Sequence, residues 1–385
     1  MSLRIAFHTS RAPASALAAI GFVWGSTAAM MPQIQAAAGI NDGTLGAVLF
    51  LAAIGSVAAM GAAPAFGDWA PRLSLPLSGI ALALSLGFLG LSTASLWVLA
   101  LALICVGLST GLLDILGNAR VAMLEAETDL RLMNLNHGTY SLSYAGAAVA
   151  TGLARDAGLS ISLWFGVMMV AALFMVPLMA LDSAAPSKRD SYEGGTTGGR
   201  GPIGTMAILA GCVAMMSFFA ENATEHWSAL HIERTLGQGA ALGALGPAML
   251  GLTMGLGRFA GHFLTLPGRE TALMRVAALV ASFGLMLAAL APVVWMAYLG
   301  FALLGLGVSV VAPLALSLAG QTASAELRAR AVARAAMISY FGFFMGPPLM
   351  GFLAQAAGLR VAFGFAALAL LVVPLLLLPM MQRRL

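Results

Sequence analysis

Residues 97–121 read WVLALALICVGLSTGLLDILGNARV, and this stretch predicts how the whole chain folds. It is long enough to cross a bilayer as a helix, because a span needs about 20 mostly apolar residues. One acid, Asp114, lies among its apolar residues. A carboxyl group inside a span costs about 2.5–3.5 kcal/mol on insertion scales, so we expect it to face the interior of a helix bundle or a water-filled cavity.

Apolar segments of similar length fill most of the remaining chain. Of its 385 residues, 60% are hydrophobic and only 9% are charged, and the mean hydropathy is +0.94. A soluble domain has no place for so much apolar surface, whereas lipid solvates it. The predicted spans are 14–37, 43–66, 73–94, 97–121, 133–154, 159–181, 204–226, 240–264, 272–290, 292–317, 331–354 and 359–380. The sequence therefore predicts an all-α membrane protein with 12 transmembrane helices.

Basic residues are distributed unevenly over the connecting loops. Of the 19 Lys and Arg residues, only Arg155, Arg234 and Arg360 fall on the side opposite the termini, and Arg258 lies within a span. Basic loops stay on the cytoplasmic side of a membrane, so we expect both termini to be cytoplasmic in a bacterial inner membrane. The cations are dispersed and form no patch, which gives no basis for nucleic-acid binding.

A polar stretch divides the chain into two halves. Residues 182–203 are rich in Gly, Ser and charged residues and predict a flexible cytoplasmic linker. They separate an N-terminal half, residues 1–181, from a C-terminal half, residues 204–385. At a constant offset of 200 residues, Thr139-Tyr140 matches Ser339-Tyr340 and Gly146 matches Gly346. Such matches indicate a duplicated unit of six helices.

The loop between the second and third spans carries a family signature in degraded form. Asp68 and Arg72 are present, whereas Pro64 and Pro71 replace two glycines, and residues 261–269 keep a complementary subset. With two halves of six helices, the chain resembles the major facilitator superfamily. In that family this loop latches the cytoplasmic ends of the halves together. The resemblance implies this gate role for Asp68 and Arg72, and an ordinary turn that anchors the loop is the alternative.

Asp114 carries the clearest chemistry. It shares one helix face with Gly107 and Asn118, at spacings of seven and four residues. Low-dielectric surroundings disfavour a charged carboxylate, which suits a group that binds and releases a proton during transport. We therefore expect Asp114 to couple transport to protons. The alternative is a permanent ion pair with Arg120 or Arg258.

The resemblance narrows around Asp114. This acid, Asn118, and then Asn134 and His137 in the fifth span are similar to the fucose-permease-like branch and its rhizopine-locus-associated relatives. In sugar–proton symporters of that branch, the acid of the fourth helix is the protonation site. A second acid expected in the first helix is missing, because Ala28 stands at its position. Sugar specificity therefore does not carry over to this chain.

The seventh predicted span supplies another acid. Glu221 lies deep enough in the span to need a partner or a proton, and we expect it to face the central cavity and to couple transport to protons. Glu225 and His226 are expected near the outer interface. A solvated position for Glu221, at a frayed helix end, is the alternative.

Neutral polar and aromatic residues surround these acids in the sequence. Such residues suit a site for a polar organic solute at the midplane. The candidate substrate-binding residues are Trp24, Thr27, Asn118, Asn134, His137, Tyr140, Tyr144, Asn222 and Trp227. Interhelical packing is the alternative for a Ser or Thr, and a pH-responsive gate is the alternative for His137.

Arg258 lies about two turns inside the eighth span. We expect it to form part of the cytoplasmic gate. Binding of an anionic substrate, neutralisation of an acid, and snorkelling to the interface are the alternatives.

The remaining inventory excludes several classes of protein. Cys105 and Cys212 are lone thiols within spans, and we find no metal-ligand cluster, nucleotide-binding loop or nucleophile–base pair. We therefore expect neither a cofactor nor an enzyme, but a monomeric transporter of a small polar solute, driven by protons through alternating access. A proton-antiport exporter of a metabolite or amphiphilic drug is the main alternative. A uniporter and a non-transporting receptor also stay open.

Overall fold

The computed structural model describes residues 3–128, 130–181, 204–264, 268–324 and 327–384. These residues form helices and connecting turns, with no strand among them. The elements are α1 (Leu3–Thr9), α2 (Arg11–Ala38), α3 (Asp42–Trp69), α4 (Ser74–Gly90), α5 (Leu96–Thr128), α6 (Met133–Asp156), α7 (Ile161–Leu173), α8 (Val176–Met179), α9 (Thr205–Leu230), the π-helical turn η1 (His231–Thr235), α10 (Ala240–Leu264), α11 (Glu270–Leu290), α12 (Val294–Gln321), α13 (Arg328–Ala357), α14 (Leu359–Val372), the π-helical turn η2 (Val373–Leu377) and α15 (Leu378–Gln382).

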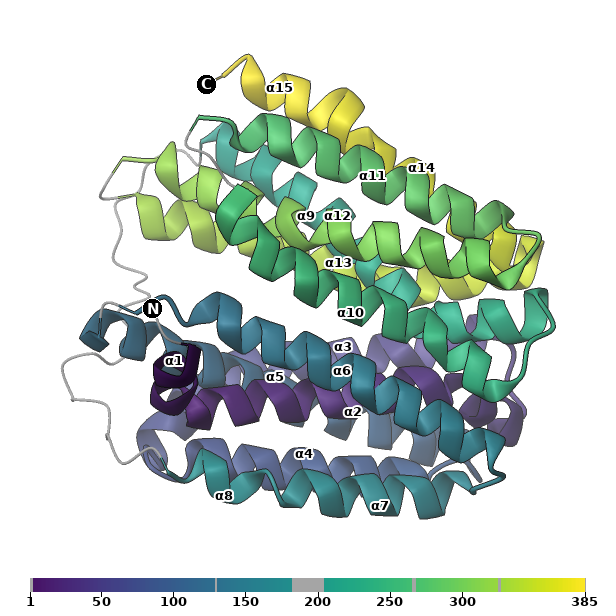
Figure 1. The fold of residues 1–385 in the computed structure, drawn as a ribbon. Coiled ribbons are helices and arrows are strands. Elements are labelled where there is room, and N and C mark those ends of the chain that lie inside the picture. The colour runs from purple at the N-terminus through teal and green to yellow at the C-terminus, as the bar shows by residue number, and fades with distance from the viewer. Residues whose placement is uncertain (1–2, 129, 182–203, 265–267, 325–326, 385) are drawn as a thin grey trace.

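The helices form two bundles, which lie one above the other in Figure 1. Helices α2 to α8 make up the lower bundle, and α9 to α15 make up the upper one. Across the boundary, α6 packs against α10 and α3 packs against α13. Both chain ends lie at one end of the molecule, here called the terminal end, and the opposite end is the far end. The predicted linker, residues 182–203, lies outside the described residues.

Ten helical segments of the described chain are long and apolar enough to cross a membrane. Two predicted spans are not among them. Helix α4 is apolar but has only 17 residues. Helix α6 has 24 residues, and its polar side chains lower its hydropathy. Because α6 packs between α2 and α10, those side chains can face protein and need not face lipid. With these two helices, each of the 12 predicted spans corresponds to a helical segment, which confirms the predicted fold class.

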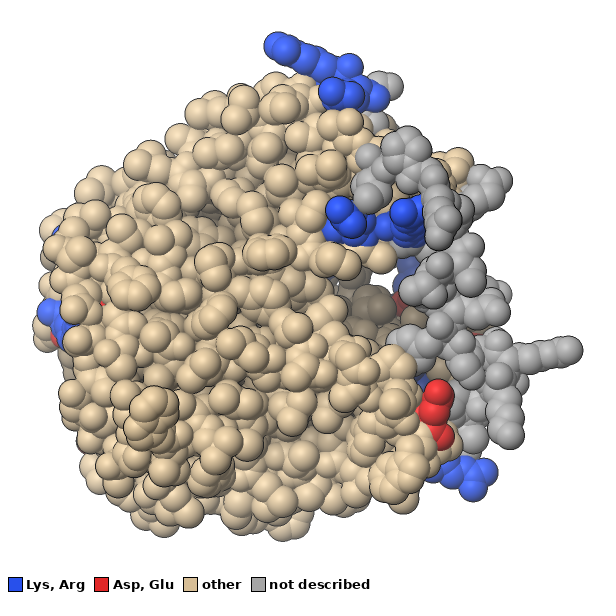
Figure 2. All heavy atoms as spheres, turned by 180° about the vertical axis from the view of Figure 1, so that it is seen from behind, with Lys and Arg blue, Asp and Glu red and all other residues tan. Residues whose placement is uncertain are grey.

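The outer surface of the bundle is apolar. Large hydrophobic side chains such as Leu101, Phe283 and Leu368 are more than half exposed. Figure 2 shows a broad band without charged side chains across the face in view, with the visible Lys, Arg, Asp and Glu near its two ends. An exposed apolar surface of this extent requires a lipid solvent.

The C-terminal ends of two spans differ from the prediction. The span that begins at Thr205 continues as α9 to Leu230 and then as η1 to Thr235, about nine residues beyond the predicted end at residue 226. The last span changes to the π-helical turn η2 around Pro374, since proline lacks the N–H that an α-helix needs. The extension of α9 matters for the site, because it places Glu225 well inside the helix.

Glycines bring α2 and α6 into close contact. A Cβ atom at Gly25 would collide with the backbone carbonyl of Tyr144, and one at Gly21 would collide with that of Tyr140. Small residues allow such an approach between membrane helices. This contact fixes the face of α6 that carries both tyrosines relative to α2.

We expect Gly25→Val to lower the melting temperature of the purified protein. The added side chain must push α6 away from α2, and overpacking of this kind costs about 1–3 kcal/mol. Gly146→Val is the matched control on α6, because a Cβ atom there meets nothing within 4 Å. Equal melting temperatures for the two variants would contradict the close contact.

Candidate functional site

The predicted polar residues converge where the two bundles meet, about midway along the helices. Glu225 of α9 is 7% exposed, and the hydroxyl of Tyr140 on α6 donates to its Oε1 over 3.5 Å. The ring of Trp24 on α2 meets the ring of His226 edge to face, with centroids 5.5 Å apart. The expectation that Glu225 and His226 lie at the outer interface was wrong, because α9 continues beyond them and both are buried.

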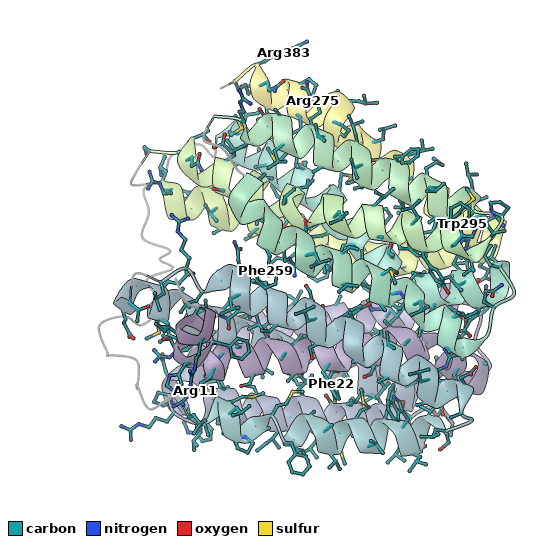
Figure 3. The ribbon with its side chains drawn as sticks, in the orientation of Figure 1. Arg11, Phe22, Phe259, Arg275, Trp295 and Arg383 are labelled. Atoms are coloured by element: carbon teal, nitrogen blue, oxygen red, sulfur yellow. The ribbon has the colours of Figure 1, made fainter. Side chains whose placement is uncertain are left out.

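Arg258 bridges the two bundles at this level. Its Nη1 donates to Oγ of Ser141 on α6 over 3.0 Å, and its Nη2 lies 3.8 Å from Oε1 of Glu221 on α9. Phe259, the next residue, faces α6 across the boundary (Figure 3), and its ring fills the space that a side chain at position 138 would need. Of the roles weighed for Arg258, neutralisation of an acid fits these contacts, and the gate role stays a prediction.

Asp114 lies on α5 and is half-buried. Its Oδ1 and its backbone carbonyl both accept hydrogen bonds from Nδ2 of Asn118, each over 2.9 Å. The described residues offer it no ion pair, since Arg120 pairs with Glu127 at 3.7 Å and Arg258 lies beside Glu221. The permanent ion pair considered for Asp114 is therefore not formed in this conformation.

The other predicted substrate contacts divide into two groups. His137 is half-buried on α6, one turn before Ser141, the partner of Arg258, and Tyr144 stacks on Tyr140 with centroids 6.2 Å apart. Asn222 is 8% exposed, and its buried Oδ1 has no partner among the described residues. Tyr144 and Asn222 therefore lie near the acids of α9, and His137 lies near Arg258.

Three of the predicted substrate-binding residues lie away from the acids or have side chains that other parts of the protein already contact. Thr27 is fully buried and donates its hydroxyl to the carbonyl of Val23 in its own helix over 2.8 Å. Trp227 is fully buried in the hydrophobic core, and Asn134 is exposed in the first turn of α6. Helical spacing alone did not reveal these environments, because they depend on which neighbouring helix covers each face.

The predicted cytoplasmic latch is not closed in this conformation. Asp68 is exposed at the terminal end of α3, and Arg72 is exposed in the turn that follows. The second copy of the loop, residues 261–269, lies partly outside the described residues. Figure 2 shows a hollow in the right-hand part of that view, between the bundles. The gate role of Asp68 and Arg72 stays a prediction.

The far end of the molecule is held shut by ion pairs that the sequence did not reveal. Arg155, near the end of α6, donates from Nη1 and Nη2 to the two carboxylate oxygens of Glu233 in η1, over 2.7 and 2.9 Å. The same Nη1 donates to the carbonyl of Ala29 over 2.6 Å. The side chains of Arg155 and Glu233 are only 6% and 15% exposed. This pair joins the two bundles in a fixed, bidentate geometry.

A second ion pair lies beside the first. Arg234 donates to both carboxylate oxygens of Asp42 on α3, over 2.7 and 2.8 Å, and Gln35 contacts both partners. The backbone N–H of Gly43 donates to Oε1 of Gln355 on α13 over 2.8 Å. Together, Arg155–Glu233 and Arg234–Asp42 are here called the far-end ion pairs.

The π-helical turn η1 supplies one partner to each far-end ion pair. Glu233 and Arg234 are consecutive in this turn, so their side chains leave it in different directions. One therefore reaches α6 and the other reaches α3. Irregular π turns of this kind are frequent at functional sites. In the sequence, the charged pair Glu233 and Arg234 directly after an apolar span was the feature that could have indicated these ion pairs. Arg234 contributed only to the prediction of membrane topology.

Comparisons with known proteins show which family the chain is similar to. The sequence profile of the Major Facilitator Superfamily matches residues 259–384. Over 362 residues the chain is 28% identical to an uncharacterized MFS-type transporter of Yersinia pestis, covering 92% of this chain and 91% of that protein. The chain is similar to transporters of the major facilitator superfamily. It is also 25% identical to the membrane protein MosC of Rhizobium meliloti over 351 residues, which cover 90% of this chain and 83% of MosC.

Solved structures of the superfamily share the fold. The xylose transporter XylE from E. coli, in an inward open conformation, superposes with a TM-score of 0.73 at 14% identity and covers 97% of this chain and 95% of its own. A bacterial homolog of the human lysosomal transporter Spinster gives a TM-score of 0.71 at 15% identity, covering 97% and 96%. At these identities the likeness shows the superfamily fold and no substrate. The narrower resemblance to fucose permeases stays a prediction.

Proposed function

We propose that this protein is a proton-coupled secondary transporter that moves a small polar organic solute across the bacterial inner membrane. The observation that carries the proposal is a set of three carboxyls inside the spans, Asp114 on α5 and Glu221 and Glu225 on α9, of which the two on α9 lie at the boundary between the bundles. Acids at this depth are costly and mark ion or substrate pathways in membrane proteins. Their position, where two repeats meet midway through the membrane, is typical of transporter binding sites.

The proposed cycle uses the contacts on both sides of this site. With the termini in the cytoplasm, the far-end ion pairs close the outer entrance in this conformation. Rocking of the bundles breaks these pairs and closes the terminal end, with Asp68 and Arg72 as candidate latch residues. Asp114 and Glu221 then take protons from outside, and Arg258 neutralises Glu221 after its proton leaves.

The solute is proposed to bind among the aromatic and amide side chains beside the acids. Trp24, Tyr140 and Tyr144 supply aromatic walls, and Asn222 and His137 supply hydrogen-bonding groups. A few placed polar groups among aromatic walls suit a small polar organic molecule. Such a site serves uptake by symport and export by antiport equally well, so the direction of transport depends on the order of binding.

A ligand screen tests this function directly. We expect a polar metabolite to raise the melting temperature of the purified protein when sugars, inositols, amino acids, organic acids and amphiphilic drugs are compared. A ligand at 100 times its dissociation constant adds about 2.7 kcal/mol to stability. The ligand found should then accumulate in proteoliposomes when a pH gradient is applied. Stabilisation by amphiphilic compounds alone would contradict a polar-solute transporter and favour drug export.

A further inference from the structure

The charges at the centre of the molecule do not balance. Within the described residues, two carboxyls, those of Glu221 and Glu225, lie at the boundary between the bundles with one guanidinium, that of Arg258. A third carboxyl, that of Asp114, lies on α5. Arg258 lies 3.8 Å from Glu221, and Asp114 accepts from the neutral amide of Asn118. Glu225 therefore has no cationic partner, although a charged group in such surroundings normally has one.

The contacts of Glu225 are weak for a carboxyl that is 7% exposed. One oxygen lies at the limit of hydrogen bonding, 3.5 Å from the hydroxyl of Tyr140. The described residues supply no ion pair to it. By contrast, each acid of the far-end ion pairs has both oxygens bound to a guanidinium at 2.7–2.9 Å. The chain therefore pairs buried acids tightly elsewhere and leaves Glu225 unpaired.

A second observation points to a ligand at the same place. The side chain of Tyr144 is 99% buried, since its exposure is 1%, and its hydroxyl has no hydrogen-bond partner among the described residues. Tyr144 stacks on Tyr140, whose hydroxyl donates to Glu225, so the two tyrosines lie on the same side of α6 as this acid. A buried hydroxyl without a partner costs free energy, and a bound molecule that hydrogen-bonds to it removes that cost.

Aromatic rings complete the surroundings of Glu225. Tyr140 and Tyr144 stack on each other on α6. Trp24 approaches from α2, where its ring meets that of His226, the neighbour of Glu225. Faces of Trp and Tyr rings attract ammonium groups, by about 0.5–2 kcal/mol depending on solvation. A carboxyl and several aromatic rings together therefore favour a cation over a neutral or anionic group.

We propose that Glu225, Tyr140, Tyr144 and Trp24 form a subsite for a protonated amine carried by the transported solute. This inference rests on the proposed function and specifies its substrate class: a small polar molecule with a primary amine or a related cationic nitrogen. The ammonium group donates to the free carboxylate oxygen of Glu225 and to the hydroxyl oxygen of Tyr144. Asp114 and Glu221 remain available for protons, so the cation and the coupled protons occupy different carboxyls.

Matched amines and amides test the subsite. The probes are glucosamine, putrescine and tyramine, each compared with its N-acetylated form, and glucose serves as a neutral polyol. Dose-dependent thermal shifts are measured on the full-length protein in lipid nanodiscs. N-acetylation removes the positive charge of the amine and keeps the scaffold. We expect at least one free amine to bind at least about tenfold more tightly than its acetylated form.

Variants then locate the charge preference. Glu225→Gln keeps the shape of the side chain and should abolish the preference for the amine, while affinity for the acetylated form changes less than about twofold. Glu270→Gln is the matched control, because this acid lies in the first turn of α11, outside the central site. It should retain the wild-type preference.

The outcomes separate this inference from the proposed function. The amine subsite is overturned if no free amine of the panel binds wild-type protein, if the acetylated forms bind equally well, or if Glu225→Gln keeps the preference. If a neutral sugar binds and accumulates with a pH gradient while the amines do not bind, the result supports the transport function and contradicts the amine subsite. If amines bind but no probe is transported in response to a pH gradient, the result contradicts proton coupling and supports the amine subsite.

Discussion

Asp114→Asn is expected to abolish accumulation of the solute driven by a pH gradient and to leave counterflow of labelled solute intact. Net accumulation should drop to the level seen without a gradient. The reason is that Asn keeps the size of the side chain and its contact with Asn118, but it cannot bind and release a proton. Proteoliposomes containing the purified protein and the ligand found by the thermal-shift screen provide both measurements.

A control on the same helix distinguishes coupling from folding. Glu127 also lies on α5, where its exposed side chain pairs with Arg120 at 3.7 Å. Glu127→Gln should therefore leave both accumulation and counterflow near wild-type levels, because the Glu127 side chain is 51% exposed and long ion pairs of a solvated carboxylate contribute only about 0–1 kcal/mol. Loss of both transport modes in Asp114→Asn, with a lowered melting temperature, would show that Asp114 has a structural role and no role in coupling.

Glu233→Gln is expected to open the far end of the molecule. Gln cannot neutralise the buried guanidinium of Arg155, and removing one partner of a buried ion pair costs about 3–5 kcal/mol. The conformation shown here would lose that free energy, whereas a conformation with the far end open would not. A difference of about 1.4 kcal/mol already shifts the ratio of the two conformations tenfold.

A cysteine beneath the far-end ion pairs reports this opening. Ala148 is fully buried in a small cluster with Ala29, Ala244 and Ala248, where α6 meets α10. In a background with Cys105 and Cys212 replaced by Ser, Ala148→Cys should react with a maleimide at least about tenfold faster when Glu233→Gln is added. Glu270→Gln, at the terminal end, should not change the rate.

Exchanging the charges gives the complementary test. The double variant with Arg155→Glu and Glu233→Arg restores opposite charges across the boundary, so its labelling rate should fall below that of either single variant. Full restoration is not expected, because the carbonyl of Ala29 loses its donor. Equal labelling rates in wild-type protein and Glu233→Gln would mean that packing alone closes the far end.

Some features of the site follow from the spacing of residues in the sequence. The spacing of Asp114 and Asn118 predicted a shared helix face, and the structure joins them by a hydrogen bond of 2.9 Å. Glu221 was predicted to be deep in its span, and it is 6% exposed. Contacts within one helix follow from its period of 3.6 residues, so the sequence alone reveals them. Glu225 was misplaced because the end of an apolar run does not mark where the helix ends.

Contacts between the two bundles cannot be predicted from the spacing of residues in the sequence. Arg155 and Glu233 are 78 residues apart, and Arg234 and Asp42 are 192 residues apart. Each of these residues read alone as a charge at a helix end, which is where solvated charges are common. Their partners depend on how two bundles dock, and docking is fixed by backbone approach at glycines such as Gly46, where α3 meets Pro347 and Pro348 of α13.

The sequence by itself determined that the chain lies in a membrane, that it forms 12 helical segments, and that Asp114 and Glu221 lie within them. Lipid imposes these features segment by segment, because every span must be apolar and must satisfy its own backbone. Only the tertiary structure decided which end is closed, that Arg258 lies beside Glu221, and that Glu225 has no ion pair among the described residues. These depend on which helix faces become neighbours, a property of the packed bundles that no single segment encodes.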